Sequence, residues 1–243
     1  IATGGKAGIQ YGCYGDGYRF AESLGHSIVK PVPALDGLVA AEDLSLLHGV
    51  RVKARAGLLK TCGGQTEEIA HDTGEVQFTK GSVSGICVMN LSRYVRFSEG
   101  CEYSLSLDLF PETDIEDLKE QLFYRKRMFG CGMSWLLPEK LKEYLHTRMS
   151  PEKHGPAAMA EIAKDLRFQI TGTKGWKSAQ VTCGGVPLSE IDRITFESLA
   201  VKELYLVGEL LDYDGPCGGY NLSWAFHSGL SAGMNAAMGQ TQQ

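Results

Sequence analysis

The sequence predicts a mixed α/β (α+β) fold, and three observations support this class. Short apolar strands end in Gly-Gly turns near both ends of the chain, the middle alternates apolar and polar residues, and three helical stretches follow it. The 243 residues, 43% of them hydrophobic, are enough to form a core in one large or two small domains. No apolar run approaches the about 18–20 residues that a membrane span needs.

Local signals predict the first elements of the chain. A strand end and a glycine-rich loop lead into a helix, in which Tyr18, Ala21 and Leu24 have apolar spacing and Gly25 marks the end. A strand is expected over residues 26–32.

The middle of the chain, residues 46–110, is expected to be rich in strands. Strands are predicted at 50–54, around Ile69, at 75–78 and most clearly at 103–109, with a turn at 71–74 and a short helix at 84–91.

The last part of the chain returns to helices and two short strands. Helices are predicted over 114–129, from Pro138 onward and over 156–168, separated by the segments 130–132 and 150–151. A return strand is expected over 178–182, an apolar strand of a buried parallel sheet over 204–207, a loop over 212–219 and a final helix over about 221–238.

Glycine turns follow three of these strand-like segments, at residues 4–5, at 184–185 and from 208 to 218–219. In an open parallel sheet, ligands bind outside the carboxyl ends of the strands, where glycine lets the backbone approach a ligand closely. One such turn alone indicates a tight bend. Three of them favour a nucleotide-like ligand.

The final helix carries the most informative of these turns. Asn221 is a suitable N-cap, so the free amides around residues 219–222 would form an anion site for a pyrophosphate or for a reduced flavin. Small residues along the helix predict close packing on a sheet, with or without a ligand: Ala225, Gly229, Ala232, Gly233 and Ala236.

Glu209 directly follows the apolar strand at 204–207. A carboxylate at a buried strand end costs several kcal/mol unless it meets hydrogen-bond donors, and ribose or ribityl hydroxyls are suitable donors. Asp212 and Asp214 could act in the same way, although loop aspartates are more often turn formers. We therefore predict Glu209 as a ligand residue.

Charge and cysteine usage limit the functional classes. With 24 Lys and Arg against 29 Asp and Glu, the net charge is −5, which argues against a dedicated nucleic-acid or membrane partner but leaves local basic patches possible. We expect a small-molecule substrate. The seven cysteines show no Cys-x-x-Cys pair, so we expect unpaired thiols, no metal site and a cytoplasmic location. The chain starts at Ile1 without a signal peptide, which suggests a fragment.

The segments 195–198, 204–209, 211–212 and 215–222 closely resemble the C-terminal FAD signature of the BaiN/YhiN-type flavoproteins, which are NAD(P)/FAD-dependent or aminoacetone-oxidase-like oxidoreductases. Residues 2–6 with 15–18, 74–79 with 84–85, and 179–186 resemble further signatures of this family in the same order. The matches span nearly the whole chain.

This resemblance implies a partial FAD-binding Rossmann-like domain, formed by residues 1–29 and 179–243. A β-rich subdomain (30–110) and a three-helix subdomain (111–178) would form an insert in it. The expected cofactor-binding residues are Thr3, Gly4, Gly5, Gly184, Gly208, Glu209, Asp212, Gly218, Gly219, Tyr220, Asn221 and Leu222.

The chain also departs from the family pattern. The family's Gly-x-Gly-x-x-Gly unit, which holds the ADP half of FAD, should lie upstream of Ile1, and the run from Gly4 to Gly8 lacks its spacing. We therefore expect that this chain alone does not hold FAD tightly. His227 stands where many members have Ser.

The resemblance implies part of an FAD-dependent oxidoreductase that passes hydride from NAD(P)H through flavin to a small organic acceptor or to oxygen. The alternatives are a flavin-dependent RNA-modifying enzyme and a non-catalytic fragment or binding module. No catalytic residue is assigned: Cys217 lacks a second cysteine nearby, and Tyr220 and His227 are weak proton-donor candidates. The basic run at 124–127 is expected to be a solvated face. The more specific alternative is a contact with the phosphate of NADPH or with RNA.

Overall fold

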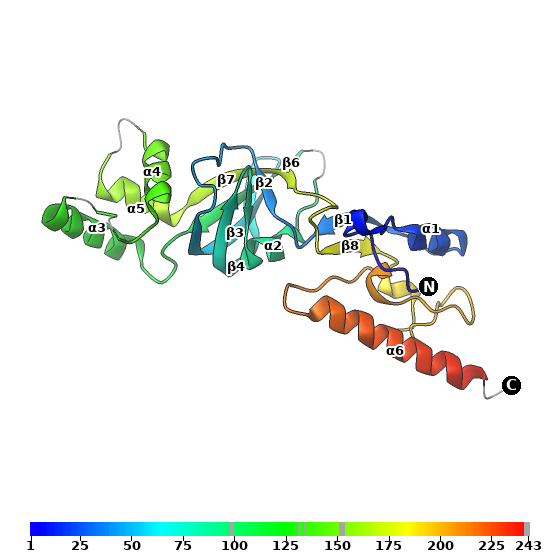
Figure 1. Ribbon diagram of the computed structural model, residues 1–243. Coiled ribbons are helices and arrows are strands. Elements are labelled where there is room, and N and C mark those ends of the chain that lie inside the picture. Colours follow the sequence, from blue (N-terminus) through cyan, green and yellow to red (C-terminus); the bar gives the residue numbers. More distant parts are fainter. Residues whose placement is uncertain (98–99, 131, 134, 151–153, 241–243) are drawn as a thin grey trace. The chain divides into compact units, whose positions relative to one another are not determined.

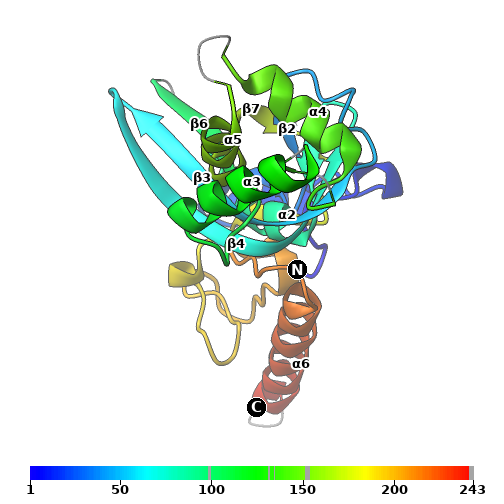
Figure 2. The same ribbon diagram turned by 90° about the vertical axis from the view of Figure 1, so that its left-hand side faces the viewer.

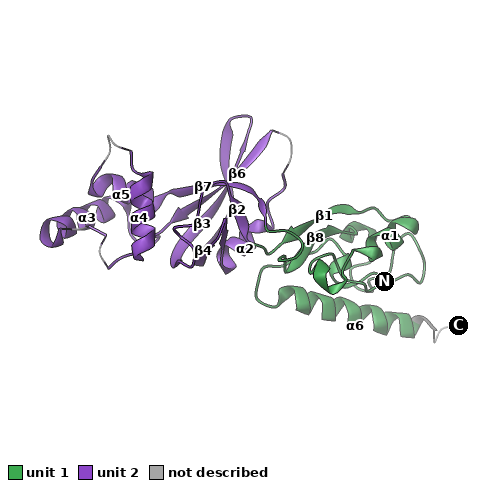
Figure 3. Cartoon of the chain, turned by 45° about the horizontal axis from the view of Figure 1, so that its top comes forward, with its two compact units in different colours: residues 1–36, 174–243 green, residues 37–173 purple. Residues whose placement is uncertain are grey.

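The computed structural model describes residues 1–97, 100–130, 132–133, 135–150 and 154–240 (Figure 1). Two compact units form, one from residues 1–36 and 174–243 and the other from residues 37–173 (Figure 3). The α/β class predicted from the sequence is confirmed. The predicted separators Cys131 and Pro151 lie outside the described residues.

Over its described residues, the first unit contains a small antiparallel sheet and two α-helices. Strands β1 (Val29–Ala34) and β8 (Val181–Gly185) pair with each other, so the open parallel sheet expected here is wrong for these two strands. The remaining elements of the unit are the 3₁₀ helices η1 (Ile9–Tyr11), η2 (Leu188–Glu190) and η3 (Gly208–Leu210) and the helices α1 (Asp16–Ser23) and α6 (Tyr220–Gln240).

Residues 204–207 do not form the predicted strand. Tyr205 makes a single antiparallel bridge with Glu197, while the Ile1 amine donates to the Tyr205 carbonyl and the Val207 amide donates to the Ile1 carbonyl. These last two bonds follow the pattern of parallel pairing. Residues 204–207 thus pair with isolated residues and do not form the continuous hydrogen-bonded ladder of a strand.

The core of the first unit lies between α1, α6 and the chain that follows β8. Tyr18 and Ala21, three residues apart on α1, are buried with Phe196, Leu206 and other apolar side chains. On α6, Ala232 joins this core, whereas a side chain added at Gly229 or Gly233 would meet no neighbouring atom. The close packing predicted for the small residues therefore does not extend to these two glycines. The solvent side of α6 is apolar at every fourth residue: Leu222, Phe226, Leu230, Met234 and Met238.

The second unit is a closed antiparallel barrel with strand order β2-β5-β4-β3-β6-β7 (Figure 2). Its longest hairpin joins β3 to β4 through Gly63 and Gly64, which both have positive φ, as a two-residue hairpin turn requires. The strands are β2 (Leu38–Ala40), β3 (Arg51–Cys62), β4 (Gln65–Thr79), β5 (Ser82–Ser84), β6 (Cys101–Asp108) and β7 (Leu166–Thr173).

The turn predicted at residues 71–74 is wrong, because β4 runs straight through it. Asp72 lies opposite Ala56 and Gly74 lies opposite Ala54 on β3. Pairing with a long neighbouring strand supplies backbone hydrogen bonds that outweigh the local turn preference of His-Asp-Thr-Gly.

Four helices complete the described part of the second unit, and Figure 1 shows α3, α4 and α5 gathered at one end of the barrel. Asp114 caps α3 by accepting a hydrogen bond from the Glu116 amide at 2.9 Å, and Gly130 ends it in the left-handed conformation. The bounds are α2 (Ile86–Ser92), α3 (Ile115–Phe129), α4 (Glu139–Arg148) and α5 (Pro156–Lys164).

The third predicted helix is shorter than expected. Residues 166–168 had the helical period, but they belong to β7 and pair with β6, where Leu107 lies opposite Leu166. Leu166 and Phe168 are buried in the barrel core, so closure of the barrel decides their conformation.

The expectation that all cysteines are unpaired is also wrong. Cys62 and Cys101 form a disulfide although 39 positions separate them, because β3 and β6 place them directly opposite each other. Cys13 and Cys87 are free thiols. Among the residues that the structure describes, no helix is long and apolar enough to cross a membrane.

Candidate functional site

The first glycine turn lies against Glu209 in the first unit, and the second follows Thr182, which also contacts Glu209. A side chain at Gly5 would bring its Cβ within 2.3 Å of Glu209 Oε1 and 2.4 Å of Thr182 Oγ1. Only glycine leaves room for both groups, since real Cβ atoms do not approach this closely. The sequence pattern predicted Gly5 as a position of close approach, and the group that approaches it is a protein carboxylate.

Thr182 on β8 connects these turns, and its side chain is completely buried. Its hydroxyl oxygen accepts hydrogen bonds from the amides of Lys6 (2.7 Å) and Ala7 (3.0 Å), while its own amide donates to the Glu209 carboxylate at 2.7 Å. Sequence reasoning did not select Thr182. The available signal was a hydroxyl side chain inside an apolar strand, directly before Cys-Gly-Gly.

The Glu209 carboxyl is half-buried in η3, and burial raises its pKa. The hydrogen bonds from Thr182 act in the opposite direction, because they stabilise the charged form. Burial likewise raises the pKa of Tyr18, and the nearby charge of Glu209 raises it further. Glu209 therefore carries an electrostatic cost that a hydrogen-bond donor from a ligand would reduce.

Two other predicted glycine positions have a packing explanation. At Gly184, a Cβ would lie 2.8 Å from the Val29 carbonyl oxygen and 2.7 Å from that of Lys30, both on β1. At Gly185 it would lie 2.4 Å from the Leu210 carbonyl oxygen. The structure thus places the backbone of β1 and η3, rather than open space, against these residues.

Thr3 and Gly4 lie at the other side of the first turn. A Cβ at Gly17 on α1 would come within 2.0 Å of Thr3 Oγ1, so Thr3 packs against the start of that helix. Gly4 has a φ of 72° and no atom within 4 Å of an added Cβ, which leaves it facing open space.

Gly208 is bound to α6 through both of its backbone groups. Its amide donates to Ser228 Oγ at 2.9 Å, and its carbonyl accepts from Trp224 Nε1 at 3.0 Å. Asp212 lies two residues beyond η3, and its amide donates to the Val186 carbonyl at 2.8 Å. Residues 208–212 are thereby held between α6 and the end of β8.

Asn221 is not the N-cap of α6, contrary to the prediction. The helix already includes Tyr220, and the Ser223 amide donates to the Gly219 carbonyl at 2.9 Å. The Asn221 side chain instead accepts from the Gly215 amide (2.8 Å) and donates to the Gly215 carbonyl (2.9 Å). Asn221 therefore closes the preceding loop, and its position one residue inside the helix explains the change of role.

The start of α6 is open to solvent. Gly218 and Gly219 have φ values of 127° and 92°, and both are exposed, as are Tyr220 and Leu222. The first amides of a helix have no partner within it and carry its partial positive charge. Cys217 Sγ lies 4.0 Å from Gln180 Oε1, so this loop passes close to the start of β8.

His227 is exposed on α6, but it lies against an aromatic side chain. Its ring stands edge-on to Phe196 at a centroid distance of 5.9 Å, next to Trp224, which contacts Phe196 at 5.5 Å. Among the residues that the structure describes, no three His, Cys, Asp or Glu side chains gather as a metal-binding group would.

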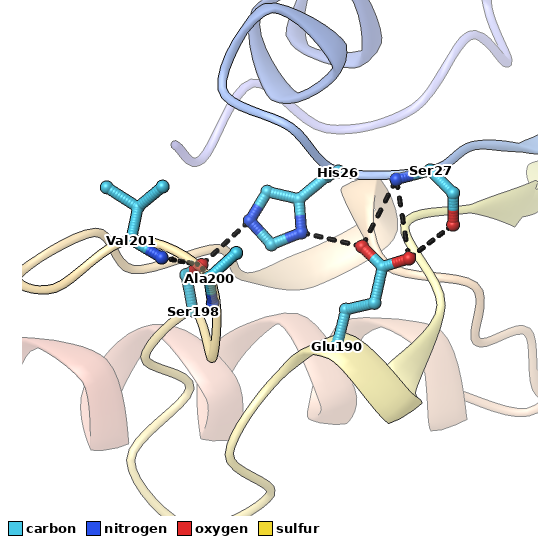
Figure 4. Close-up of polar contacts among 6 residues, drawn as sticks. All are labelled: His26, Ser27, Glu190, Ser198, Ala200 and Val201. Carbon is cyan, nitrogen blue, oxygen red and sulfur yellow. Dashed lines mark hydrogen bonds and ion pairs between the residues drawn. The ribbon is translucent and has the colours of Figure 1, made fainter.

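A second polar cluster in this unit was not found from the sequence (Figure 4). The hydroxyl of Ser198 lies 2.8 Å from His26 Nε2, and His26 Nδ1 lies 2.8 Å from the Glu190 carboxylate. Ser27 binds the same carboxylate through its amide and its hydroxyl. The order serine, histidine, carboxylate matches that of a hydrolytic triad.

The surroundings of Ser198 argue for a structural role of this cluster. Its oxygen also accepts from the amides of Ala200 (3.1 Å) and Val201 (2.9 Å), so its one donor and two acceptor positions are all used. Ser198 and His26 are only 7% and 4% exposed. The cluster ties residues 26–27 to residues 190–201, which are more distant in the sequence.

The second unit contains a cavity of about 390 Å³ among its helices. Its lining combines the apolar residues Leu122, Met133 and Met159 with the titratable side chains of Lys126, His146 and His154. Its volume lies in the range of small-molecule pockets.

Comparison with known proteins gives one family match and several relatives. Residues 1–235 match the family described as HI0933-like protein Rossmann domain. The chain is 35% identical over 256 residues to a 3-dehydro-bile acid delta(4,6)-reductase of Clostridium scindens, covering 98% of this chain and 61% of that protein.

Two further relatives have a different name. Ribosomal RNA dihydrouridine synthases of Haemophilus influenzae and Escherichia coli are 29% and 30% identical to the chain over 248 and 250 residues. These matches cover 97% and 94% of this chain and 59% and 58% of those proteins. The chain thus spans about three fifths of the length of these curated relatives.

Proposed function

Because this chain belongs to the family of HI0933-like protein Rossmann domains, we propose that it is part of an FAD-dependent oxidoreductase. The whole protein would transfer hydride from NAD(P)H through flavin to an organic acceptor or to oxygen. The family match agrees with the resemblance of the sequence to the BaiN/YhiN-type flavoproteins.

One observation carries this proposal: a half-buried carboxyl with a raised pKa stands between two glycine turns. Glu209 takes one backbone hydrogen bond from Thr182, and its burial favours further donors of the kind that ribose or ribityl hydroxyls supply. The exposed amides at the start of α6, near Tyr220, suit an anionic part of the cofactor. The residues therefore fit FAD, whose isoalloxazine ring would supply the hydride chemistry.

Several of the other predicted cofactor-binding residues contact protein atoms. Gly184 and Gly208 are engaged with protein atoms, and Asn221 holds the loop before α6. We therefore propose that they shape the site, while Glu209, Gly4 and Gly219 face the cofactor. Tight binding would require the part of the whole protein that holds the ADP half.

The names of the relatives suggest the class of acceptor. A delta(4,6)-reductase and a dihydrouridine synthase both add two hydrogens across a carbon–carbon double bond. We propose that the acceptor is an organic molecule with such a bond, polarised by a neighbouring carbonyl. Hydride addition is favoured there because the carbonyl takes up the developing negative charge.

The test begins with flavin binding. The whole protein is mixed with FAD, passed through a desalting column and examined for visible flavin absorbance. We expect bound flavin, and a weaker affinity in Glu209→Gln than in the control Glu22→Gln, which changes an exposed carboxylate on α1. A colourless protein would overturn the proposal, and equal affinities would remove Glu209 from the site.

A second experiment separates an enzyme from a binding module. The flavin-loaded protein is given NADH or NADPH anaerobically, and loss of flavin colour is followed before and after addition of an enone. Bleaching followed by recovery supports the oxidoreductase. A flavin that NADH and NADPH both leave oxidised supports the non-catalytic alternative.

RNA modification is the second candidate function. It is favoured by the two relatives named as ribosomal RNA dihydrouridine synthases, although the net charge of −5 gives RNA no general attraction. Recovery of flavin colour with a uridine-containing RNA, but not with the enone, would favour this candidate.

A further inference from the structure

The buried part of the lining of the helical cavity in the second unit is apolar. Leu122 on α3, Met133 after that helix and Met159 on α5 are 0%, 3% and 5% exposed. Met149, at the end of α4, is half-buried and lines the same cavity. Methionine side chains are flexible and polarisable, so these walls can adapt to the shape of an apolar ligand.

The exposed part of the same lining is basic. Lys126, His146 and His154 are exposed, and each carries a nitrogen that can donate a hydrogen bond. An imidazole keeps one N–H donor when it is neutral, so this capacity does not depend on its charge. The lining therefore changes from apolar to hydrogen-bond donating between its buried and its exposed residues.

The position of Lys126 on α3 explains why a lysine reaches the cavity. Leu118, Leu122 and Lys126 are four residues apart and share one side of the helix, and the two leucines are buried in the core. The row passes from the core to the cavity at Lys126, one turn before the helix ends at Gly130. A lysine in such a place lays its methylene groups along apolar surface and keeps its ammonium group in water.

The charge around the cavity favours an anion. The helices α3 and α4 end at it and α5 begins at it, so the three helix dipoles together leave a partial charge of about −0.5. The ammonium group of Lys126 contributes a full positive charge, which exceeds this value. Among the described residues that line the cavity, none is Asp or Glu.

Helix capping accounts for only part of this basic lining. Lys126 and His146 stand in the last turns of α3 and α4, where the helix dipole attracts a positive charge. His154 instead precedes α5, whose first turn carries a partial positive charge. Capping therefore gives no reason for a basic side chain at position 154, whereas a bound anion would be stabilised by His154 and by the start of α5 alike.

We propose that this cavity binds a small organic anion, of the class of carboxylates with a compact apolar body. The body would lie against Leu122 and the methionines, and the carboxylate would accept hydrogen bonds from Lys126, His146 and His154. Burial of apolar surface favours binding, and the charged group stays near solvent, where its desolvation costs less than in a closed site. All lining residues belong to the second unit, so the proposal goes beyond the flavin function and does not rest on it.

Binding is tested with naphthoate and with its neutral amide, naphthamide, which have the same aromatic body. The 243-residue chain, isotope-labelled at its methionine methyl groups, is titrated with each compound, and NMR follows the methyl signals, which Met→Leu variants assign. We expect naphthoate to shift the signals of Met133, Met149 and Met159. Met234 and Met238 are exposed on α6 and report binding to any apolar surface, so their signals should not shift.

Two substitutions on α3 separate the cavity from general surface charge. Lys126→Gln removes a cation from the lining and is expected to weaken naphthoate binding about tenfold, because a hydrogen bond to a charged group is lost. Its affinity for naphthamide should be unchanged. Arg127→Gln is the matched control, since Arg127 is an exposed cation at the next position and lies outside the lining. Its naphthoate affinity should equal that of the unchanged chain.

Four results would overturn the proposal. The first is a titration with naphthoate that leaves the signals of Met133, Met149 and Met159 in place. The second is an equal shift of Met234 and Met238, which would indicate unspecific binding.

The third is equal affinity for naphthoate and naphthamide, which would indicate an apolar cavity without a preference for anions. The fourth is an equal loss of naphthoate affinity in Lys126→Gln and Arg127→Gln, which would indicate the charge of the surface alone. None of these titrations contains flavin, so their failure is distinguishable from a failure of the FAD proposal.

Discussion

The carboxylate of Glu209 accepts a hydrogen bond from the backbone amide of Thr182 at 2.7 Å, although 27 positions separate the two residues. Thr182 in turn receives the amides of Lys6 and Ala7 on its hydroxyl oxygen. Three separate segments of the chain are therefore joined through one threonine. Disturbing any of them is expected to affect the others.

Glu209→Gln is expected to change how stability depends on pH. Burial raises the pKa of Glu209 in the folded chain, so this group favours the folded state below its ordinary pKa. That advantage is lost as the pH rises through the raised pKa, where the buried carboxyl becomes charged. Urea unfolding from about pH 4 to about pH 8 should show a fall in the wild type that the variant lacks.

Glu190→Gln provides a control with the opposite sign. The hydroxyl of Ser27 lowers the pKa of Glu190 most, and His26 adds to this effect. Its contribution to stability is present above its ordinary pKa and is lost as the pH falls through the lowered one. If the stability of both variants depended on pH in the same way, the conclusion that burial raises the pKa of Glu209 would be wrong.

Gly5→Ala is expected to destabilise the first unit by about 1–3 kcal/mol, because its Cβ would collide with Glu209 and Thr182. Gly229→Ala is the matched control. It lies in α6, where an added Cβ meets no neighbour, and alanine should stabilise the helix by up to about 1 kcal/mol. Thermal unfolding of both variants measures the contrast, and equal shifts would contradict it.

Ser198→Ala is expected to cost about 1–3 kcal/mol of unfolding free energy. The change leaves the amides of Ala200 and Val201 and one nitrogen of His26 without the oxygen that they contact. Urea unfolding measures this loss. The control is Ser23→Ala at an exposed helix end, which should change the free energy of unfolding by no more than about 0.5 kcal/mol. A neutral Ser198→Ala variant would show that the cluster does not hold its segments together.

Removal of the disulfide is expected to destabilise the barrel. Closing a loop of 39 positions restricts the unfolded chain, which corresponds to about 3–4 kcal/mol. The double variant Cys62→Ser, Cys101→Ser should therefore unfold at lower urea concentration. A reducing agent should shift the wild type in the same way and leave the double variant unchanged.

Local signals in the sequence were sufficient for several elements. The helix after Asp114 begins at its cap and ends at Gly130, and α5 begins at Pro156, as predicted. The alternating strand near residues 103–109 is β6. These signals act over a few residues, so no distant partner is needed to interpret them.

Long-range pairing decided the elements that sequence reasoning missed. His71 and its neighbours have a turn composition, but they belong to β4 and pair with β3. Phe168 has helical spacing, but β6 pairs with it in β7. Hydrogen bonds to a strand far away in the sequence leave no mark in a local window.

By itself, the sequence determined the α/β class and the family, because periodicity, turn residues and signature motifs are local, while the glycine turns and Glu209 stay predictions of the cofactor site. Only the tertiary structure decided that Gly5 makes room for Glu209, that Asn221 closes a loop, and that His26 joins Glu190 to Ser198. These facts depend on which distant segments come into contact, and contact distances are set by packing of the complete fold.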